Sequence, residues 1–322
     1  MSRIRTSLST LIVLMVLGSA AAQSTIAIDG SSTVYPISMA MAEEFFIENP
    51  DVEVSVGFSG SGAGFTKLCA GEIDIADASR VIKQSELDAC AANGIEVIEL
   101  PVAADALTVV VNSANDWAQC MTVAELNTLW APGSTITAWN QIRPEWPAAS
   151  FALFGPGTDS GTFDYFTEAV NGEAGATRTD FFPSEDDNIL VQGVQSDVNA
   201  LGYFGFAYYA ENSSRVRAVS IDGGNGCVEP SVGNIESNTY TPLSRPLFIY
   251  VNLDSALDRA VSQFVEFYLD AANRDYIAET GYATYADDIY QATLERFDAR
   301  STGSAFLDFH PGDSVLEAVR GN

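Results

Sequence analysis

Three stretches near the start of the chain repeat one pattern, in which a short apolar segment ends in glycine and hydroxyl residues. The apolar segments are residues 26–28, 52–58 and 73–78, and the alternation is strict in the second of them. Such alternation predicts half-buried strands. The polar stretches that follow are residues 30–33, 59–64 and 79–80. If the three strands are parallel neighbours, these loops share one edge of a sheet, which is where open α/β sheets bind ligands.

Helical patterns separate these strands. Pro36 opens a helix that is expected to end near Asn49, and a second helix is expected near residues 65–68. Strands that alternate with helices predict an α/β fold with a parallel sheet.

A fourth polar loop, residues 157–162, comes directly before an apolar helical pattern at Phe163, Phe166 and Val170. A helix that starts this way presents free backbone N–H groups and hydroxyls, and the helix dipole favours an anion there. Alone, such a loop would indicate only a well-capped helix. The same combination of glycine and hydroxyl residues occurs in residues 30–33 and 59–64, and the three loops together indicate an anion site.

Residues 1–22 have the composition of a secretory signal peptide. Arg3 and Arg5 precede the apolar run 11–17, and three alanines follow at residues 20–22. The mature chain is expected to begin near Gln23, without a lipid anchor, since no cysteine follows the cleavage site. No later apolar run approaches the roughly 20 residues that span a membrane. The sequence therefore predicts a protein that is exported and soluble after signal cleavage, in the periplasm or otherwise outside the cytoplasm.

The remaining residues are expected to form two α/β domains joined by two crossings. Strands are predicted at residues 96–100 and 107–111, with residues 101–105 as the passage between domains. The predicted outer domain is residues 23–103 plus 247–322, and the predicted inserted domain is residues 104–246. Two crossings form a hinge, and a cleft between the domains would close over a ligand. The tail beyond Arg300 is expected to be a loosely packed extension.

Four cysteines, an even number in an exported chain, favour disulfides over metal ligands. Of the three possible connectivities, Cys69 with Cys90 and Cys120 with Cys227 is preferred, because each pair then lies within one predicted domain. No metal site and no cofactor are expected.

The charge excludes several classes of partner. The chain has 15 basic and 43 acidic residues, a formal charge of −28. Nucleic acid and anionic membranes both require a basic face, so neither is an expected partner. The acidity is expected to belong to a solvated surface. An anion would have to be held at short range, by N–H dipoles, hydroxyls and a nearby cation.

Catalytic patterns are weak. The chain has one histidine, His310, and no Gly-x-Ser-x-Gly elbow, so a serine hydrolase is poorly supported. Residues 60–64 have the wrong spacing for a dinucleotide fingerprint, and the nucleotide-binding loop pattern Gly-x-x-x-x-Gly-Lys-[Ser/Thr] does not occur. Binding of a small oxyanion without catalysis fits best. Its donors would be Ser32, Thr33, Ser61, Ser160, Gly161 and Thr162, and Arg80 would be the cation.

These motifs, in this order and spacing, resemble the exported phosphate-binding proteins of ABC-type phosphate uptake systems. The motifs are Asp29-Gly30-Ser31-Ser32-Thr33-Val34-Tyr35-Pro36, Gly60-Ser61-Gly62-Ala63-Gly64, Asp74-Ile75-Ala76-Asp77-Ala78-Ser79-Arg80, Asp159-Ser160-Gly161-Thr162-Phe163, Ala200-Leu201-Gly202-Tyr203 and Pro242-Leu243-Ser244-Arg245-Pro246-Leu247. The resemblance implies a two-domain, hinged periplasmic-binding-protein fold of type II with discontinuous domains. It also implies a dehydrated phosphate in the interdomain cleft, delivery to a membrane ABC permease, and a monomer that is not an enzyme.

Carried over by position, the resemblance assigns the phosphate contacts to Thr33 and the Val34 backbone, to Ser61, and to residues 160–162. Two departures matter. Many members have an aspartate where Ser79 stands, and many have an arginine where this chain has residues 155–157. We hypothesise that Arg80 replaces that arginine. The acceptor of the phosphate proton is then Asp77 or Asp159, a choice that the sequence leaves open.

Two alternatives remain at this stage. One is a binding protein for another tetrahedral oxyanion, such as sulfate, molybdate or arsenate. The other belongs to a different class, an exported hydrolase of phosphate esters.

Overall fold

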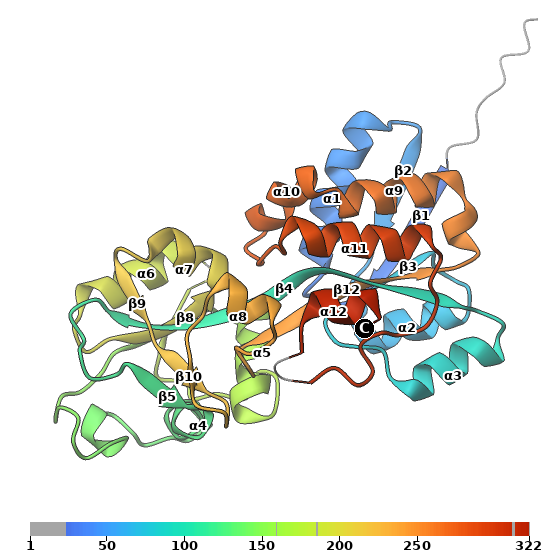
Figure 1. The fold of residues 1–322 in the computed structure, drawn as a ribbon. Helices are drawn as coiled ribbons and strands as arrows, with labels where there is room; N and C mark the ends of the chain where they lie inside the picture. The colour runs from blue at the N-terminus through green and yellow to red at the C-terminus, as the bar shows by residue number, and fades with distance from the viewer. Residues whose placement is uncertain (1–23, 159, 185, 311–312, 322) are drawn as a thin grey trace, which may run out of the picture.

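The computed structural model describes residues 24–158, 160–184, 186–310 and 313–321, and the predicted signal peptide and Asp159 lie outside them. Figure 1 shows two lobes joined by two long strands, β4 (Val97–Asn112) and β12 (Ser244–Asn252). We call the lobe with β1–β3, α1–α3 and α9–α12 the first lobe, and the lobe with β5–β11 and α4–α8 the second lobe. The domain boundaries at 103/104 and 246/247 stay a prediction.

The first lobe contains the three predicted strands, β1 (Ser24–Gly30), β2 (Val52–Val56) and β3 (Ile75–Ala78). They are parallel neighbours in the order β2-β1-β3, so their polar loops do share one edge of the sheet. The helices that follow them are α1 (Tyr35–Glu48), α2 (Ser61–Cys69) and α3 (Gln84–Ala92). Helix α1 buries Ile37, Met41 and Phe45 and ends at Asn49, as its apolar spacing predicts.

Strand β4 is continuous, so the prediction of two separate strands at residues 96–100 and 107–111 is wrong. All 16 of its residues are buried. Its first part pairs with β12 and its last part, from Leu107, pairs with β8, so one sheet runs through both lobes. Pro101 has no N–H group to donate to a neighbouring strand. It pairs with Phe248 of β12, and the β4–β12 register shifts between Phe248 and Leu247. A bulge of this kind accommodates a proline inside a strand.

The second lobe completes this sheet and adds a small three-stranded one. The large sheet continues through β8 (Leu201–Gly205), β6 (Leu153–Gly155) and β7 (Phe182–Pro183), with β9 (Val216–Ala218) also on β4; the small sheet is β5 (Cys120–Thr122), β10 (Ser220–Asp222) and β11 (Cys227–Val228). The helices are α4 (Val123–Trp130), α5 (Gly161–Asn171), α6 (Asp187–Ser196), α7 (Phe206–Asn212) and α8 (Val232–Glu236). Trp130 is fully buried and packs edge-on against Phe166 and Tyr203, which fixes α4 and α5 on the sheet.

The C-terminal part returns to the first lobe as α9 (Arg259–Leu269), α10 (Arg274–Glu279), α11 (Asp287–Asp298) and α12 (Val315–Arg320). The prediction of a loosely packed tail is wrong. Phe306 is buried, with its ring centroid 5.0 Å from that of Phe248. The buried Glu99 carboxylate on β4 accepts hydrogen bonds from the Ser304 hydroxyl (2.7 Å) and the Ala305 N–H (2.7 Å). A buried carboxylate requires such donors, and the tail supplies them.

Both predicted disulfides are confirmed. Cys69–Cys90 joins the end of α2 to α3 within the first lobe, and Cys120–Cys227 joins β5 to β11 within the second. Neither one connects the lobes, so the relative position of the lobes depends on non-covalent contacts and on the two shared strands.

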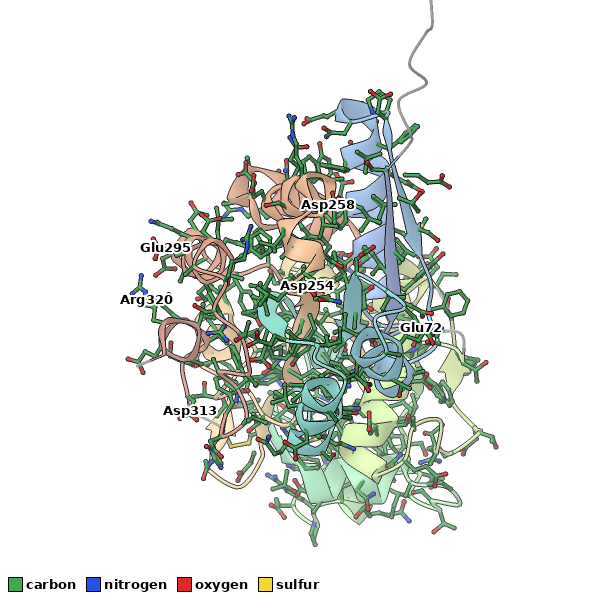
Figure 2. The ribbon with its side chains drawn as sticks, turned by 90° about the vertical axis from the view of Figure 1, so that its right-hand side faces the viewer. Glu72, Asp254, Asp258, Glu295, Asp313 and Arg320 are labelled. Carbon is green, nitrogen blue, oxygen red and sulfur yellow. A yellow bond between two sulfur atoms is a disulfide. The ribbon has the colours of Figure 1, made fainter. Side chains whose placement is uncertain are left out.

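The acidic residues are spread over the surface. Figure 2 labels exposed carboxylates on several separate elements, among them Glu72, Asp258 and Glu295. This distribution fits a solvated acidic surface. Among the residues that the structure describes, no helix has the length and apolarity needed to cross a membrane.

Candidate functional site

Glycines bring the loops after β1 and β2 into close contact at the edge of the sheet. Gly30 has a φ of +146°, and a Cβ on it would lie 2.1 Å from the Asp77 carbonyl oxygen on β3. A Cβ on Gly64 would lie 2.7 Å from the Gly30 Cα. The Gly60 N–H donates to the Gly30 carbonyl at 2.6 Å. Only glycine fits at these approaches, and the start of α2 is therefore held directly beside the loop after β1.

Ser61 and Ser79, predicted from separate loops, are in contact. The Ser79 N–H donates to the Ser61 hydroxyl oxygen at 3.2 Å, and the two hydroxyl oxygens are 3.4 Å apart. Both side chains are partly exposed. The loops after β2 and β3 therefore present two hydroxyls at one place.

The loop after β1 provides backbone donors. Thr33 is 6% exposed, and its N–H donates to the Ser31 hydroxyl at 3.2 Å. Within the described part of the chain, no hydrogen bond is found for the N–H groups of Ser32, Val34 and Ser61. Unpaired N–H groups at helix starts are ready donors for an anion.

The start of α5 in the second lobe meets this loop across the junction between the lobes. Ser160 caps α5, and its hydroxyl accepts from the Thr162 N–H at 3.2 Å. A Cβ on Gly161 would lie 3.7 Å from the Thr33 hydroxyl oxygen and 3.6 Å from the Tyr282 hydroxyl oxygen. The structure thus brings Gly161, at the start of α5, close to Thr33 from the opposite lobe.

Arg80 lies at this edge but is engaged in an ion pair that the sequence did not reveal. Its guanidinium donates to both carboxylate oxygens of Glu86, at 2.9 and 2.8 Å, and stacks over the Phe65 ring at 5.1 Å. Glu86 raises the pKa of Arg80, and burial opposes that effect. One guanidinium nitrogen lies 3.6 Å from the position of a Cβ on Gly62, so the cation remains close to the start of α2.

Asp77, one of the two predicted proton acceptors, lies inside the first lobe. Its side chain has no exposed surface, and Oδ1 accepts from the Ser38 hydroxyl at 2.9 Å. Burial raises the pKa of Asp77 to about 8, against the lowering effect of the Ser38 hydrogen bond. Oδ2 has no partner in the described structure. No surface of Asp77 faces the loops, and Asp159, the other predicted acceptor, lies outside the described residues.

Two further charged pairs organise the site and were not predicted. Asp29 accepts from the N–H groups of Gly30 (2.7 Å) and Ser59 (2.8 Å) and pairs with Lys67, which fixes the loops after β1 and β2 together. Burial raises the pKa of Asp29, but these donors outweigh it and lower the pKa overall. The only available signal was the position of Asp29 at the head of the glycine-hydroxyl motif.

Arg245 on β12 and Asp105 on β4 are cross-strand partners, with a nitrogen–oxygen distance of 3.1 Å. The Arg245 guanidinium stacks over the Tyr165 ring of α5 at 3.8 Å and lies 3.7 Å from Glu168. The shared strands therefore contact the same helix whose first residues reach Thr33.

His310 does not complete a catalytic triad. Its side chain is 74% exposed, and its ring contacts the Asp308 carbonyl and Asp313. Within the described ranges, no group of three or more histidine, cysteine, aspartate or glutamate side chains is arranged to hold a metal ion.

Comparisons with known proteins show the family to which the chain belongs. Residues 16–272 match the model of the PBP superfamily domain. Protein SphX from Synechocystis sp. is 47% identical over 299 residues, which cover 92% of this chain and 88% of that protein. The phosphate-binding protein PstS of Staphylococcus aureus is 35% identical over 274 residues, covering 84% and 81%.

A solved structure shows the same fold. The crystal structure of a possible phosphate-binding protein from Planctomyces limnophilus is 47% identical, with a TM-score of 0.82 over 87% of this chain and all of that chain. The predicted periplasmic-binding-protein fold is thereby confirmed. The chain belongs to the PBP superfamily and, within it, to the PstS-like family of phosphate-binding proteins.

Proposed function

We propose that this protein is an exported, soluble receptor that binds inorganic phosphate between its lobes and delivers it to a membrane ABC permease. The observation that carries the proposal is the approach of the α5 start to Thr33, since a Cβ on Gly161 would lie 3.7 Å from the Thr33 hydroxyl oxygen. Two helix starts from opposite lobes, with the Ser61 and Ser79 hydroxyls at the same edge, suit a small tetrahedral anion.

The proposal includes the finer assignments made from the sequence. The anion contacts are Ser32, Thr33, Val34, Ser61, Ser79, Arg80 and residues 160–162, and the protein acts as a monomer without catalysis. Each contact is a donor, and none is a nucleophile with a neighbouring base. The names of the relatives, which include a phosphate-binding protein from Staphylococcus aureus, support phosphate as the ligand.

Asp159 is the proposed acceptor of the proton of monohydrogen phosphate. The complete burial of Asp77 argues against that residue, because its carboxyl presents no surface to a ligand. A carboxylate that only accepts hydrogen bonds favours phosphate, which carries a proton at neutral pH, over sulfate, which does not.

Calorimetric titration of the mature protein, freed of carried-over ligand, tests the function. Phosphate is expected to bind, and sulfate is expected to bind at least about tenfold more weakly. Sulfate has no proton to donate to the Asp159 carboxylate, so the two negative charges repel each other. Equal affinity for both anions would contradict the proposed acceptor. No binding of phosphate would contradict the function itself.

Arg80→Ala is expected to weaken phosphate binding by about tenfold or more, because the change removes a charged donor beside the start of α2. The matched control is Arg259→Ala. Arg259 is exposed at the first turn of α9. This helix follows the end of β12 that lies far from the candidate loops. Replacing Arg259 with alanine changes the net charge by the same amount as Arg80→Ala. Titrations of both variants measure the difference. If the two variants bind phosphate alike, the Glu86 pair has withdrawn Arg80 from the site.

A further inference from the structure

Tyr282 is carried by a segment, residues 281–283, that contacts both lobes. The segment lies between α10 and α11. The backbone of Ala283 exchanges two hydrogen bonds with Ala104 of β4, at 2.8 and 3.0 Å. The Gly281 carbonyl oxygen would lie 3.2 Å from a Cβ on Gly205, at the end of β8 in the second lobe. The position of Tyr282 is therefore fixed by the strand that the two lobes share.

The Tyr282 hydroxyl reaches the start of α5. Its oxygen lies 3.6 Å from the position of a Cβ on Gly161, and the Thr33 hydroxyl oxygen lies 3.7 Å from the same point. Three groups meet there, one from the loop after β1, one from α5 and one from the segment 281–283. Within the described part of the chain, the Tyr282 hydroxyl makes no hydrogen bond, although the side chain is half-buried.

The surroundings keep this hydroxyl protonated. Burial raises the pKa of Tyr282 far above its ordinary value; Asp105 adds to the effect and Arg245 opposes it. A neutral phenol with an unused O–H group is a donor. An oxygen of an anion bound at the start of α5 would be within reach to accept a hydrogen bond from this O–H group.

Neighbouring tyrosines have different roles. The Tyr285 hydroxyl is fully buried and has no partner in the described structure, and the Tyr290 hydroxyl donates to the Val102 carbonyl at 2.8 Å. Neither one approaches Gly161 in the way that Tyr282 does. Tyr285 and Tyr290 therefore serve packing within the first lobe, whereas the hydroxyl of Tyr282 faces the junction between the lobes.

We propose that Tyr282 is a further anion-contacting residue, whose hydroxyl donates a hydrogen bond to phosphate bound between Thr33 and residues 160–162. The inference rests on the proposed function and deepens it. Since the tyrosine belongs to the first lobe and Gly161 to the second, a bound oxygen that accepts from both also holds the lobes together.

Tyr282→Phe tests this inference, with Tyr285→Phe as the matched control. Tyr282→Phe is expected to weaken phosphate binding by about tenfold or more, because a hydrogen bond to a charged group is lost. Tyr285→Phe is expected to leave the affinity unchanged. Neither variant should lower the thermal midpoint of the phosphate-free protein, since neither hydroxyl has a hydrogen-bond partner among the described residues. If wild type binds phosphate and Tyr282→Phe binds it equally well, the inference is overturned and the function stands. If wild type does not bind phosphate, the function itself fails.

Gly161→Ala tests the same contact by a change in the second lobe. The added methyl group meets its neighbours at 3.6 Å or more, so the fold tolerates it, but it lies in contact with both hydroxyl oxygens. In that background Tyr282→Phe is expected to cause a clearly smaller loss of affinity than in wild type. Fully additive losses would contradict a shared contact with the anion.

Discussion

Asp77→Asn is expected to remove a strong pH dependence from the stability of this protein. The buried carboxyl has a pKa of about 8 in the folded state, against 3.8 as its ordinary value. Because the folded state binds this proton more tightly, the stability contributed by protonated Asp77 is fully present below about pH 4 and is lost as the pH rises to about 8. The free energy of unfolding should therefore fall by more than ~1 kcal/mol per pH unit in that window, or roughly 4 kcal/mol between pH 5 and 8.

Urea denaturation of phosphate-free protein at pH 5 and pH 8 measures this effect. Asparagine retains an oxygen that accepts from Ser38 and carries no titratable proton, so the variant should be more stable than wild type at pH 8 and similar to it at pH 5. Asp51→Asn makes the same change of charge at an exposed position and should follow wild type. Parallel pH profiles for Asp77→Asn and wild type would mean that Asp77 is ionised in the folded protein.

Gly64→Ala is expected to damage both stability and phosphate binding. The new methyl group would lie 2.7 Å from the Gly30 Cα and 2.9 Å from the Asp29 carbonyl oxygen, both of them backbone atoms that cannot move aside separately. Helix α2 must then shift away from β1, at a cost of about 1–3 kcal/mol in the free energy of unfolding. Ser61 stands at the start of the same helix, so the proposed phosphate contact shifts with it.

Gly62→Ala provides the control within the same turn. Its methyl group would meet only the Arg80 guanidinium, at 3.6 Å, which is an ordinary contact. Alanine is also a better helix former than glycine, by up to about 1 kcal/mol. Gly62→Ala should therefore be as stable as wild type or more stable. Denaturation curves and phosphate titrations of both variants measure the contrast, and a Gly64→Ala protein with wild-type stability would refute the close packing of α2 on β1.

The sequence predicted the first lobe well because its signals are local. Alternation over residues 52–56 and the helical spacing from Ile37 to Phe45 each arise from one element burying one face. The prediction of two strands on either side of Pro101 failed, since the bulge that accommodates the proline depends on register with β12, almost 150 positions further along the chain. Prediction from the sequence failed again beyond Arg300, where the packing is set by the buried Glu99 and Phe248 rather than by periodicity.

The loops of the candidate site could be proposed from the sequence, but the side-chain contacts within it could not. Glycine and hydroxyl residues at strand ends made Thr33 and Ser61 candidates from sequence, because the carboxyl ends of parallel strands meet at the edge of the sheet where ligands bind. The pairing of Arg80 with Glu86, the burial of Asp77 and the reach of Tyr282 each depend on which side chains the fold brings together. Residue spacing along the chain does not contain that information.

Strand β4 has a consequence for how the molecule folds and how it can be taken apart. Its buried residues complete the β12 pairing in one lobe and the β8 pairing in the other. Cutting the chain between the lobes would divide one continuous strand whose residues are all buried, and would expose apolar residues at the cut end of each fragment. We therefore expect fragments that contain a single lobe to be less stable than the intact chain.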